Sequence, residues 1–227
     1  MSRTAPSPLL ITFSGIDGAG KSTQINALTG LLSASGYRVQ RYAFWDDVCV
    51  LKRSREETMI KAFKGQRGIG APGNPVRRRD KNVRRWYLTL GRCFLYLLDV
   101  LSLYRVLNKR TEADVIIFDR YAYDELATLQ LDQPLQRAYT RSVLSIVPKP
   151  ALAFLLDAEP EIAHLRKPEY PVPFLRRYRD AYLKLAAQAN IRILPPASVE
   201  VMQEAIAREV AACCSSDMSA HRAQSAA

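Results

Sequence analysis

The segment I-T-F-S-G-I-D-G-A-G-K-S-T-Q at residues 11–24 decides the fold, because residues 15–22 complete the pattern G-x-x-x-x-G-K-S. An apolar run at residues 9–13 precedes the pattern and predicts a buried parallel strand. Ile25, Leu28, Leu31 and Leu32 then recur at helical spacing, and Gly36 ends the predicted helix. A strand, a glycine-rich turn and a helix in this order form the context in which the pattern binds phosphate.

Each polar residue of this loop suits a nucleotide polyphosphate. Glycines allow backbone N–H groups to curl around a phosphate, and the helix N-terminus adds a favourable dipole. The Lys21 ammonium can bridge the β- and γ-phosphates, the Ser22 hydroxyl is the expected Mg²⁺ ligand, and Thr23 can support the α-phosphate. The predicted ATP-binding residues are therefore Gly15, Asp17, Gly18, Ala19, Gly20, Lys21, Ser22 and Thr23.

Asp17 is an unusual residue inside such a loop. A carboxylate beside a polyphosphate is repelled unless it faces another partner. That partner could be a hydroxyl or arginine on the acceptor side, or a hydrated metal ion. Alternatively, Asp17 caps the backbone of its own loop.

The rest of the chain alternates predicted strands and helices. Strands are expected at residues 37–44, 115–118, 152–156 and 191–194, and helices at residues 86–107, 160–166, 174–189 and 198–212. This alternation predicts a three-layer α/β fold, a parallel sheet of about five strands with helices on both faces. Ligands of such folds bind at the carboxyl ends of the strands. We expect one domain at residues 1–212 and a disordered tail at residues 213–227.

The net charge of +11 is concentrated in one segment. Between residues 61 and 85 the only acid is Asp80, and the basic residues are Lys61, Lys64, Arg67, Arg77, Arg78, Arg79, Lys81, Arg84 and Arg85. Glycines and prolines at residues 65–75 predict a loop, so residues 64–85 are expected to be a mobile basic loop. Such a loop could simply be solvated, or it could attract a phosphorylated substrate or, through residues 77–85, weakly contact an anionic membrane. Because the excess charge is local, we expect no nucleic-acid partner.

Residues 86–107 are strongly apolar and close to the length of about 20 residues that a membrane span needs. Arg92, Asp99 and Arg105 interrupt this stretch, which favours a buried or groove-lining helix over an interfacial or membrane helix. The first eight residues lack the apolar core of a signal peptide. The four cysteines show neither metal-type nor disulfide-type spacing, so we expect a reducing cytoplasm.

With D-R-Y at residues 119–121 added to the loop, the chain resembles the thymidylate kinases. Residues 11–24 and 115–121 are similar to that family's loop and D-R-Y strand end. Residues 149–157 resemble another of its strands, and residues 174–186 resemble its helix that carries two arginines and a tyrosine. Order and spacing agree over most of the chain, except at residues 46–100.

The resemblance implies transfer of the ATP γ-phosphate to a (deoxy)nucleoside monophosphate, with dTMP to dTDP as the first expectation. It implies that Arg120 grips the acceptor phosphate, Asp119 lies near the Mg²⁺ waters, and Asp17 organises the acceptor side. A short lid at residues 164–179 would carry catalytic arginines, because Ala19 stands where some relatives have a basic loop residue. The implied catalytic residues are Lys21, Arg120, Asp17, Arg166 and Arg176, with Arg179 as a further lid arginine. Relatives commonly form homodimers through helices near the apolar segment.

The acceptor side departs from the family pattern. An arginine expected after the second strand is absent at Trp45, Asp46 and Asp47, and a base-reading arginine is absent at Leu98 and Asp99. The remaining acceptor-binding candidates are Asp17, Phe94, Arg120, Tyr121 and Tyr123.

Several alternatives follow. The aromatic candidates could be ordinary core residues, Asp119 and Arg120 a surface ion pair, and the lid arginines a solvated helix face. A kinase of the same fold with another nucleotide, sugar phosphate or lipid-linked acceptor is the main alternative function. A non-catalytic ATP-binding protein is the third hypothesis.

Overall fold

The computed structural model describes residues 8–52, 55, 86–109, 112–129 and 131–225. Its centre is a five-stranded sheet in the order β2-β3-β1-β4-β5, and every paired neighbour is parallel. The strands are β1 Leu9–Ser14, β2 Val39–Ala43, β3 Val115–Asp119, β4 Leu152–Leu156 and β5 Arg192–Leu194. This arrangement confirms the predicted α/β fold.

The three central strands contain apolar runs because both faces of the sheet are covered. Ile11 of β1 lies opposite Ile117 of β3 and Leu152 of β4, and all three side chains are buried. Burial on both faces explains why these strands lack the alternation of apolar and polar residues that one-sided strands show. The same registers place the carboxyl ends of β1 and β3 side by side, with Phe13 opposite Asp119.

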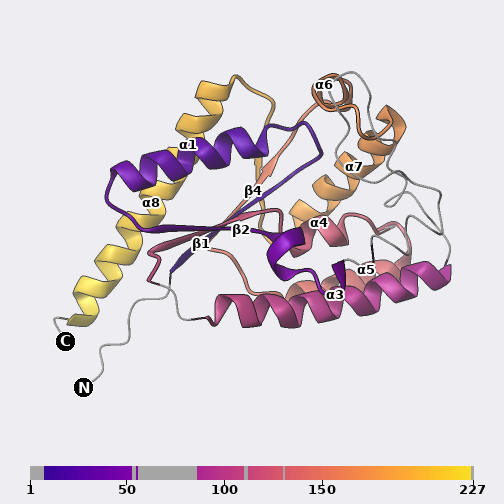
Figure 1. Cartoon of the computed structure of the whole chain (residues 1–227), viewed down its shortest axis with the longest axis horizontal. Helices are drawn as coiled ribbons and strands as arrows, with labels where there is room; N and C mark the ends of the chain where they lie inside the picture. The colour runs from indigo at the N-terminus through magenta and orange to yellow at the C-terminus, as the bar shows by residue number, and fades with distance from the viewer. Residues whose placement is uncertain (1–7, 53–54, 56–85, 110–111, 130, 226–227) are drawn as a thin grey trace.

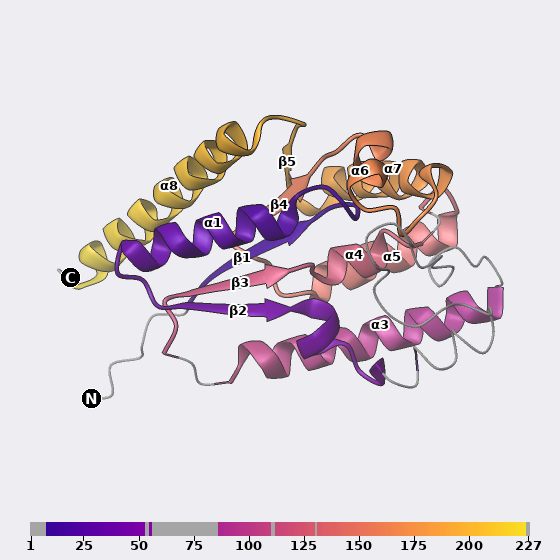
Figure 2. The same cartoon turned by 45° about the horizontal axis from the view of Figure 1, so that its top comes forward.

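Helices form the two outer layers. They are α1 Lys21–Ala34, α3 Trp86–Leu107, α4 Ala122–Leu126, α5 Pro134–Ile146, α6 Pro160–Arg166, α7 Val172–Ala189 and α8 Val199–Ser225, with the π-helix η1 at Phe44–Val48. Figures 1 and 2 show α1 and α8 over one face of the sheet and α3 under the other. In Figure 2 the strand arrows point towards α4, α6 and α7, so these helices surround the edge at which ligands of such sheets bind.

Two features of the helices were not predicted. α4 and α5 follow β3, in a stretch for which no element was predicted. α8 continues to Ser225, whereas we expected a helix ending at residue 212 and a disordered tail. Residues 199–225 contain neither glycine nor proline, so no helix-breaking residue ends the helix at residue 212. The predicted basic loop at residues 64–85 lies outside the described residues.

Helix α3 has one buried and one exposed apolar face. Tyr96, Val100, Leu103 and Val106 pack into the core, which agrees with the expectation of a buried helix. The opposite face exposes Leu90, Phe94, Leu97, Leu101 and Tyr104. No helix in the described part of the chain is both long and apolar enough to cross a membrane.

Candidate active site

At two positions of the loop between β1 and α1, a neighbouring backbone lies so close that only glycine fits. Gly15 has φ 143°, and a Cβ there would lie 2.6 Å from the carbonyl oxygen of Leu156. Gly18 has φ 87°, and a Cβ there would lie 2.3 Å from the carbonyl oxygen of Ala163 in α6. Both the left-handed backbone and the lack of space exclude larger side chains. The loop therefore packs tightly between the end of β4 and α6, the helix at the start of the predicted lid.

Lys21 lies at the first position of α1 and folds back over this loop. Its Nζ donates to the carbonyl oxygens of Gly15 at 2.8 Å and Ile16 at 3.0 Å, and only 7% of the residue is exposed. Burial, together with the positive charge of Arg120, lowers the pKa of Lys21 to about 8, although nearby carboxylates act in the opposite direction. The ammonium is thus held inside the curve of the loop, where a phosphate could replace the two carbonyls.

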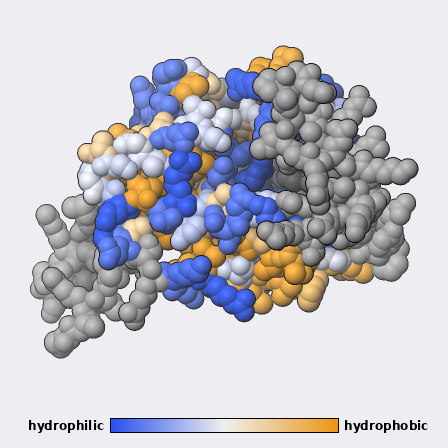
Figure 3. Space-filling view, in the orientation of Figure 1, coloured by the Kyte–Doolittle hydropathy of each residue, from blue (hydrophilic) through white to orange (hydrophobic). Residues whose placement is uncertain are grey.

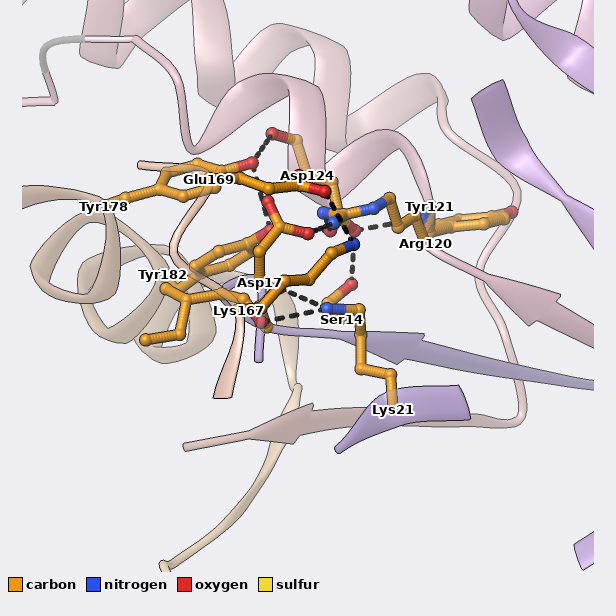
Figure 4. A network of polar contacts seen from close by, with 12 residues as sticks. Ser14, Asp17, Lys21, Arg120, Tyr121, Asp124, Lys167, Glu169, Tyr178 and Tyr182 are labelled. Atoms are coloured by element: carbon orange, nitrogen blue, oxygen red, sulfur yellow. Dashed lines mark hydrogen bonds and ion pairs between the residues drawn. The ribbon is translucent and has the colours of Figure 1, made fainter. Parts of the chain in front are cut away.

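Arg120 follows β3 and lies between two carboxylates (Figure 4). Its Nη2 pairs with Oδ1 of Asp17, and its Nη1 donates to Oδ1 of Asp124 at 3.1 Å. Burial acts to lower the pKa of Arg120, but Asp17 and Asp124 together raise it. Asp17 therefore faces an arginine of the neighbouring strand end, one of the two partners that the sequence analysis considered.

The backbone of Arg120 is in the left-handed region, with φ 68°. A non-glycine residue in this conformation needs support from its surroundings. The Arg120 N–H donates to the carbonyl oxygen of Phe13 at 2.9 Å, which ties the turn to the end of β1. This backbone hydrogen bond and the two carboxylates hold the arginine next to the phosphate loop.

Asp124 is a buried carboxylate that the sequence analysis missed. Ser14 Oγ donates to it at 2.7 Å and Tyr182 Oη at 2.5 Å, from positions 110 and 58 residues away in the chain. Burial and the Asp124 charge raise the pKa of both Tyr178 and Tyr182, so their hydroxyls stay protonated donors at neutral pH. The sequence did not single out Asp124, because two of its donors, Ser14 and Tyr182, come from distant elements.

The predicted metal ligands suit Mg²⁺ chemically. Ser22 is exposed at the start of α1, directly after Lys21. Asp119 ends β3, and its Oδ1 is buried without a hydrogen-bond partner among the described residues. An unpaired buried carboxylate oxygen beside the phosphate loop fits a hydrated hard cation, which prefers oxygen ligands. Within the described residues, no cluster of three or more His, Cys, Asp or Glu side chains could hold a metal by itself.

The predicted lid arginines lie on α6 and α7 and differ in their contacts. Arg179 makes a bidentate pair with Asp157, with distances of 2.6 and 2.7 Å. Arg176 pairs with Glu161, with 2.8 Å from its Nε to Oε1, and Arg166 is exposed at the end of α6. Arg176 and Arg179 thus bind carboxylates of this chain, from which they would have to move to reach a phosphate.

The aromatic acceptor candidates fall into two places, because the rings of Tyr121 and Tyr123 are in contact, with centroids 5.2 Å apart, and Phe94 lies on another element. Tyr121 and Tyr123 are buried, and the Tyr121 hydroxyl donates to the carbonyl oxygen of Pro148 at 2.7 Å. Phe94 is 63% exposed on the outer face of α3. The structure brings Asp17 and Arg120 together, and Tyr121 and Tyr123 together, while Phe94 lies on the exposed face of α3.

Asp99, at the position expected for a base-reading arginine, pairs with Arg55 instead. The guanidinium of Arg55 donates to both oxygens of Asp99 at 2.9 and 2.8 Å, and the Val50 N–H donates at 2.8 Å. The two side chains are only 2% and 10% exposed. Burial raises the pKa of Asp99, while its bonds with Arg55 act to lower it. A buried ion pair between α3 and the segment after β2 therefore occupies this part of the molecule.

Comparisons with known proteins agree on one family by sequence. A probable thymidylate kinase of Archaeoglobus fulgidus is 25% identical over 209 residues, which is 89% of this chain and 94% of the relative. A probable thymidylate kinase 1 of Saccharolobus solfataricus is 28% identical (87% and 94% covered), and a thymidylate kinase of Maridesulfovibrio salexigens is 29% identical (82% and 86% covered). No protein-family model matches the chain.

The fold is also similar to a solved structure. The crystal structure of thymidylate kinase from Ehrlichia chaffeensis superposes with a TM-score of 0.55 at 16% identity. The match covers 90% of this chain and 99% of the other. At this identity the similarity supports the fold alone.

Proposed function

We propose that the chain, which is similar to several thymidylate kinases, transfers the γ-phosphate of ATP to a nucleoside monophosphate, converting dTMP to dTDP. The observation that carries this proposal is the contact between Arg120 and Asp17. It joins the loop that would bind the donor to the strand end that would bind the acceptor. A kinase needs both at one place, whereas a protein that only binds ATP needs the loop alone.

Transfer requires the two substrates to lie in line and their negative charge to be neutralised. On this proposal the Lys21 ammonium leaves the carbonyls of Gly15 and Ile16 and binds the β- and γ-phosphates. Backbone N–H groups of residues 15–20 and the start of α1 bind the same phosphates. An oxygen of the acceptor phosphate then attacks the γ-phosphorus, the bond to the β-phosphate oxygen breaks, and ADP leaves.

On the acceptor side, Arg120 would bind the phosphate that attacks. Its guanidinium is already directed at the loop by Asp17 and Asp124, so little ordering remains when the acceptor binds. Arg166 and Arg176 would approach the transferred group when the lid closes. For Arg176 this requires exchange of Glu161 for phosphate oxygens, and an exposed ion pair such as this one costs little to break.

Mg²⁺ is the cofactor that this site would take. Ser22 and the unpaired Oδ1 of Asp119, through water, would hold it. When bound, Mg²⁺ neutralises charge on the β- and γ-phosphates.

Partner and location proposals rest on separate observations. The exposed face of α3 repeats apolar residues three and four positions apart, and Figure 3 shows hydrophobic side chains gathered along the lower edge, over α3. We propose that a second copy of this chain covers that face. Light scattering should then give the mass of a dimer, and Leu101→Glu should give a monomer.

The chain's four cysteines are free thiols, which agrees with the proposed cytoplasmic location. Weak membrane contact through residues 77–85 is proposed from charge alone.

An acceptor panel tests the proposed function. Purified protein is incubated with Mg²⁺, ATP and each nucleoside monophosphate in turn, and ADP release is measured. The proposal predicts the fastest release with dTMP. Release only with another class of phosphorylated acceptor would favour the alternative kinase, and ATP binding without any acceptor-dependent release would favour a non-catalytic protein.

A further inference from the structure

Asp124 on α4 makes four hydrogen bonds or ion pairs through one buried carboxylate. Its Oδ2 accepts from Ser14 Oγ at 2.7 Å and from the Tyr121 N–H at 2.9 Å. Its Oδ1 accepts from Tyr182 Oη at 2.5 Å and from Arg120 Nη1 at 3.1 Å. The residue is 3% exposed, and Figure 4 shows these groups converging on it. Both oxygens are therefore fully used.

This arrangement fixes the carboxylate independently of Arg120. Ser14 belongs to β1, the Tyr121 N–H to the turn before α4, and Tyr182 to α7. Three donors on three elements leave the Asp124 side chain little rotational freedom. Asp17, by contrast, lies on the loop that would rearrange around phosphate. Of the two carboxylates beside Arg120, Asp124 is the one with a fixed position.

We propose that Asp124 is a positioning residue for acceptor binding, and this rests on the proposed function. Asp124 holds one edge of the Arg120 guanidinium, so that the other edge faces the phosphate loop. In this structure Asp17 occupies that second edge. When the acceptor arrives, its phosphate replaces Asp17, while Asp124 keeps the arginine in place. Without Asp124, the long side chain would have to be ordered on binding.

The negative charge at Asp124 is part of this role. An ionised carboxylate only accepts hydrogen bonds, which suits four surrounding donors. In Asp124→Asn one oxygen becomes an NH₂ group, which must then face a donor. The charge-assisted contact with Arg120 is also lost, whichever way the amide turns.

Steady-state kinetics of Asp124→Asn with dTMP and ATP test the proposal. The KM for dTMP should rise roughly 10- to 100-fold, the factor expected for a lost hydrogen bond to a charged group, and the KM for ATP should change less than about twofold. In an Arg120→Ala background the same substitution should change the KM for dTMP by less than about twofold, because the contact is already gone. Additive effects in this cycle would overturn the proposal, and so would equal losses for both substrates.

Two tyrosine variants distinguish a positioning role of Asp124 from a purely structural role of its hydrogen-bond network. Tyr182 and Tyr178 lie one turn apart on α7; the Tyr182 hydroxyl contacts the Asp124 carboxylate and the Tyr178 hydroxyl its carbonyl at 2.8 Å. Tyr182→Phe should raise the KM for dTMP by about three- to tenfold, and Tyr178→Phe by less than about twofold. Equal effects would mean that the network only supports the fold. This pair also serves if Asp124→Asn does not fold.

NMR of the Arg120 guanidinium needs no turnover, so it tests the positioning role of Asp124 independently of the proposed function. In arginine-labelled protein the Arg120 guanidinium NMR signals should be sharp and slowly exchanging, and should broaden in Asp124→Asn and Tyr182→Phe but not in Tyr178→Phe. If the wild type phosphorylates no acceptor, the proposed function fails while this result still decides whether Asp124 fixes Arg120. Unchanged signals in both variants would overturn the positioning role.

Discussion

The proposed donor and acceptor halves of this site differ in how their charged groups are held. The donor half is a backbone loop of residues 15–20 with Lys21, whose ammonium is satisfied by two carbonyl oxygens of the loop itself. The proposed acceptor half consists of side chains in ion pairs, Arg120 with Asp124 and with Asp17 of the loop, and the buried pair of Arg55 with Asp99 stands where a base-reading arginine was expected. The donor half depends on a local segment and one cation. The acceptor half depends on carboxylates that come from distant parts of the chain.

Lys21→Ala should have the largest effect, because it removes the only loop side chain with a positive charge. Turnover with ATP and dTMP should fall roughly 1,000-fold, the upper range for loss of one group that stabilises charge in the transition state. Circular dichroism should show an unchanged fold, since Lys21 bonds only to carbonyls of its own loop. Turnover near that of the wild type would contradict the kinase assignment.

Arg120→Ala should impair use of the acceptor much more than binding of ATP. It leaves the loop intact and removes the proposed grip on the acceptor phosphate, so kcat/KM for dTMP should fall roughly 100-fold. ATP affinity measured by calorimetry should change less than about threefold. Loss of ATP affinity with normal acceptor kinetics would place Arg120 in the donor half instead.

Asp99→Asn should show how much the acceptor half depends on its buried ion pair. Breaking a buried pair by removing one partner typically costs about 3 kcal/mol or more, so the urea midpoint should fall clearly. Asp114→Asn is the matched control, because Asp114 also binds an arginine, Arg38, through both oxygens but in an exposed pair. That substitution should cost about 1 kcal/mol at most. Equal losses would mean that burial of the Arg55 pair contributes nothing.

The donor half should also have its own pH dependence. Because the pKa of Lys21 is about 8 in this structure, its ammonium is charged at pH 7 and loses its proton as the pH rises through 8. Phosphate binding needs the charged form, so ATP affinity should fall above pH 8, by at most about tenfold per pH unit. Calorimetry in buffers of different ionisation heat should detect proton uptake on binding above pH 8. A constant affinity between pH 7 and 9.5 would be inconsistent with this pKa.

The contrast between a contiguous loop and residues brought together from distant parts of the chain also explains which features the sequence could predict. The loop, its strand and its helix are contiguous, so spacing alone identified them, and apolar runs located the other central strands. Arg120 was predicted as a site residue because it adjoins a strand end in a D-R-Y motif. Asp124 was not, because Ser14 and Tyr182 reach it across 110 and 58 residues.

The Arg55–Asp99 pair could not be predicted for the same physical reason. Its partners are 44 residues apart, and neither lies in a recognisable motif. The sequence showed only that Asp99 stands where an arginine was expected, and only the tertiary structure supplies the cation that pairs with it. Helix α4 was missed because a helix of five residues carries a weak periodic signal, whereas the 13-residue α5 is strongly amphipathic and was not assigned from the sequence.

Transfer of radiolabel from γ-labelled ATP to dTMP tests most directly whether the two halves form one kinase site. The account predicts labelled dTDP and ADP in equal amounts, dependent on both substrates and on Mg²⁺, and absent with Lys21→Ala. Labelled inorganic phosphate without labelled dTDP, or no release of label from ATP, would contradict it.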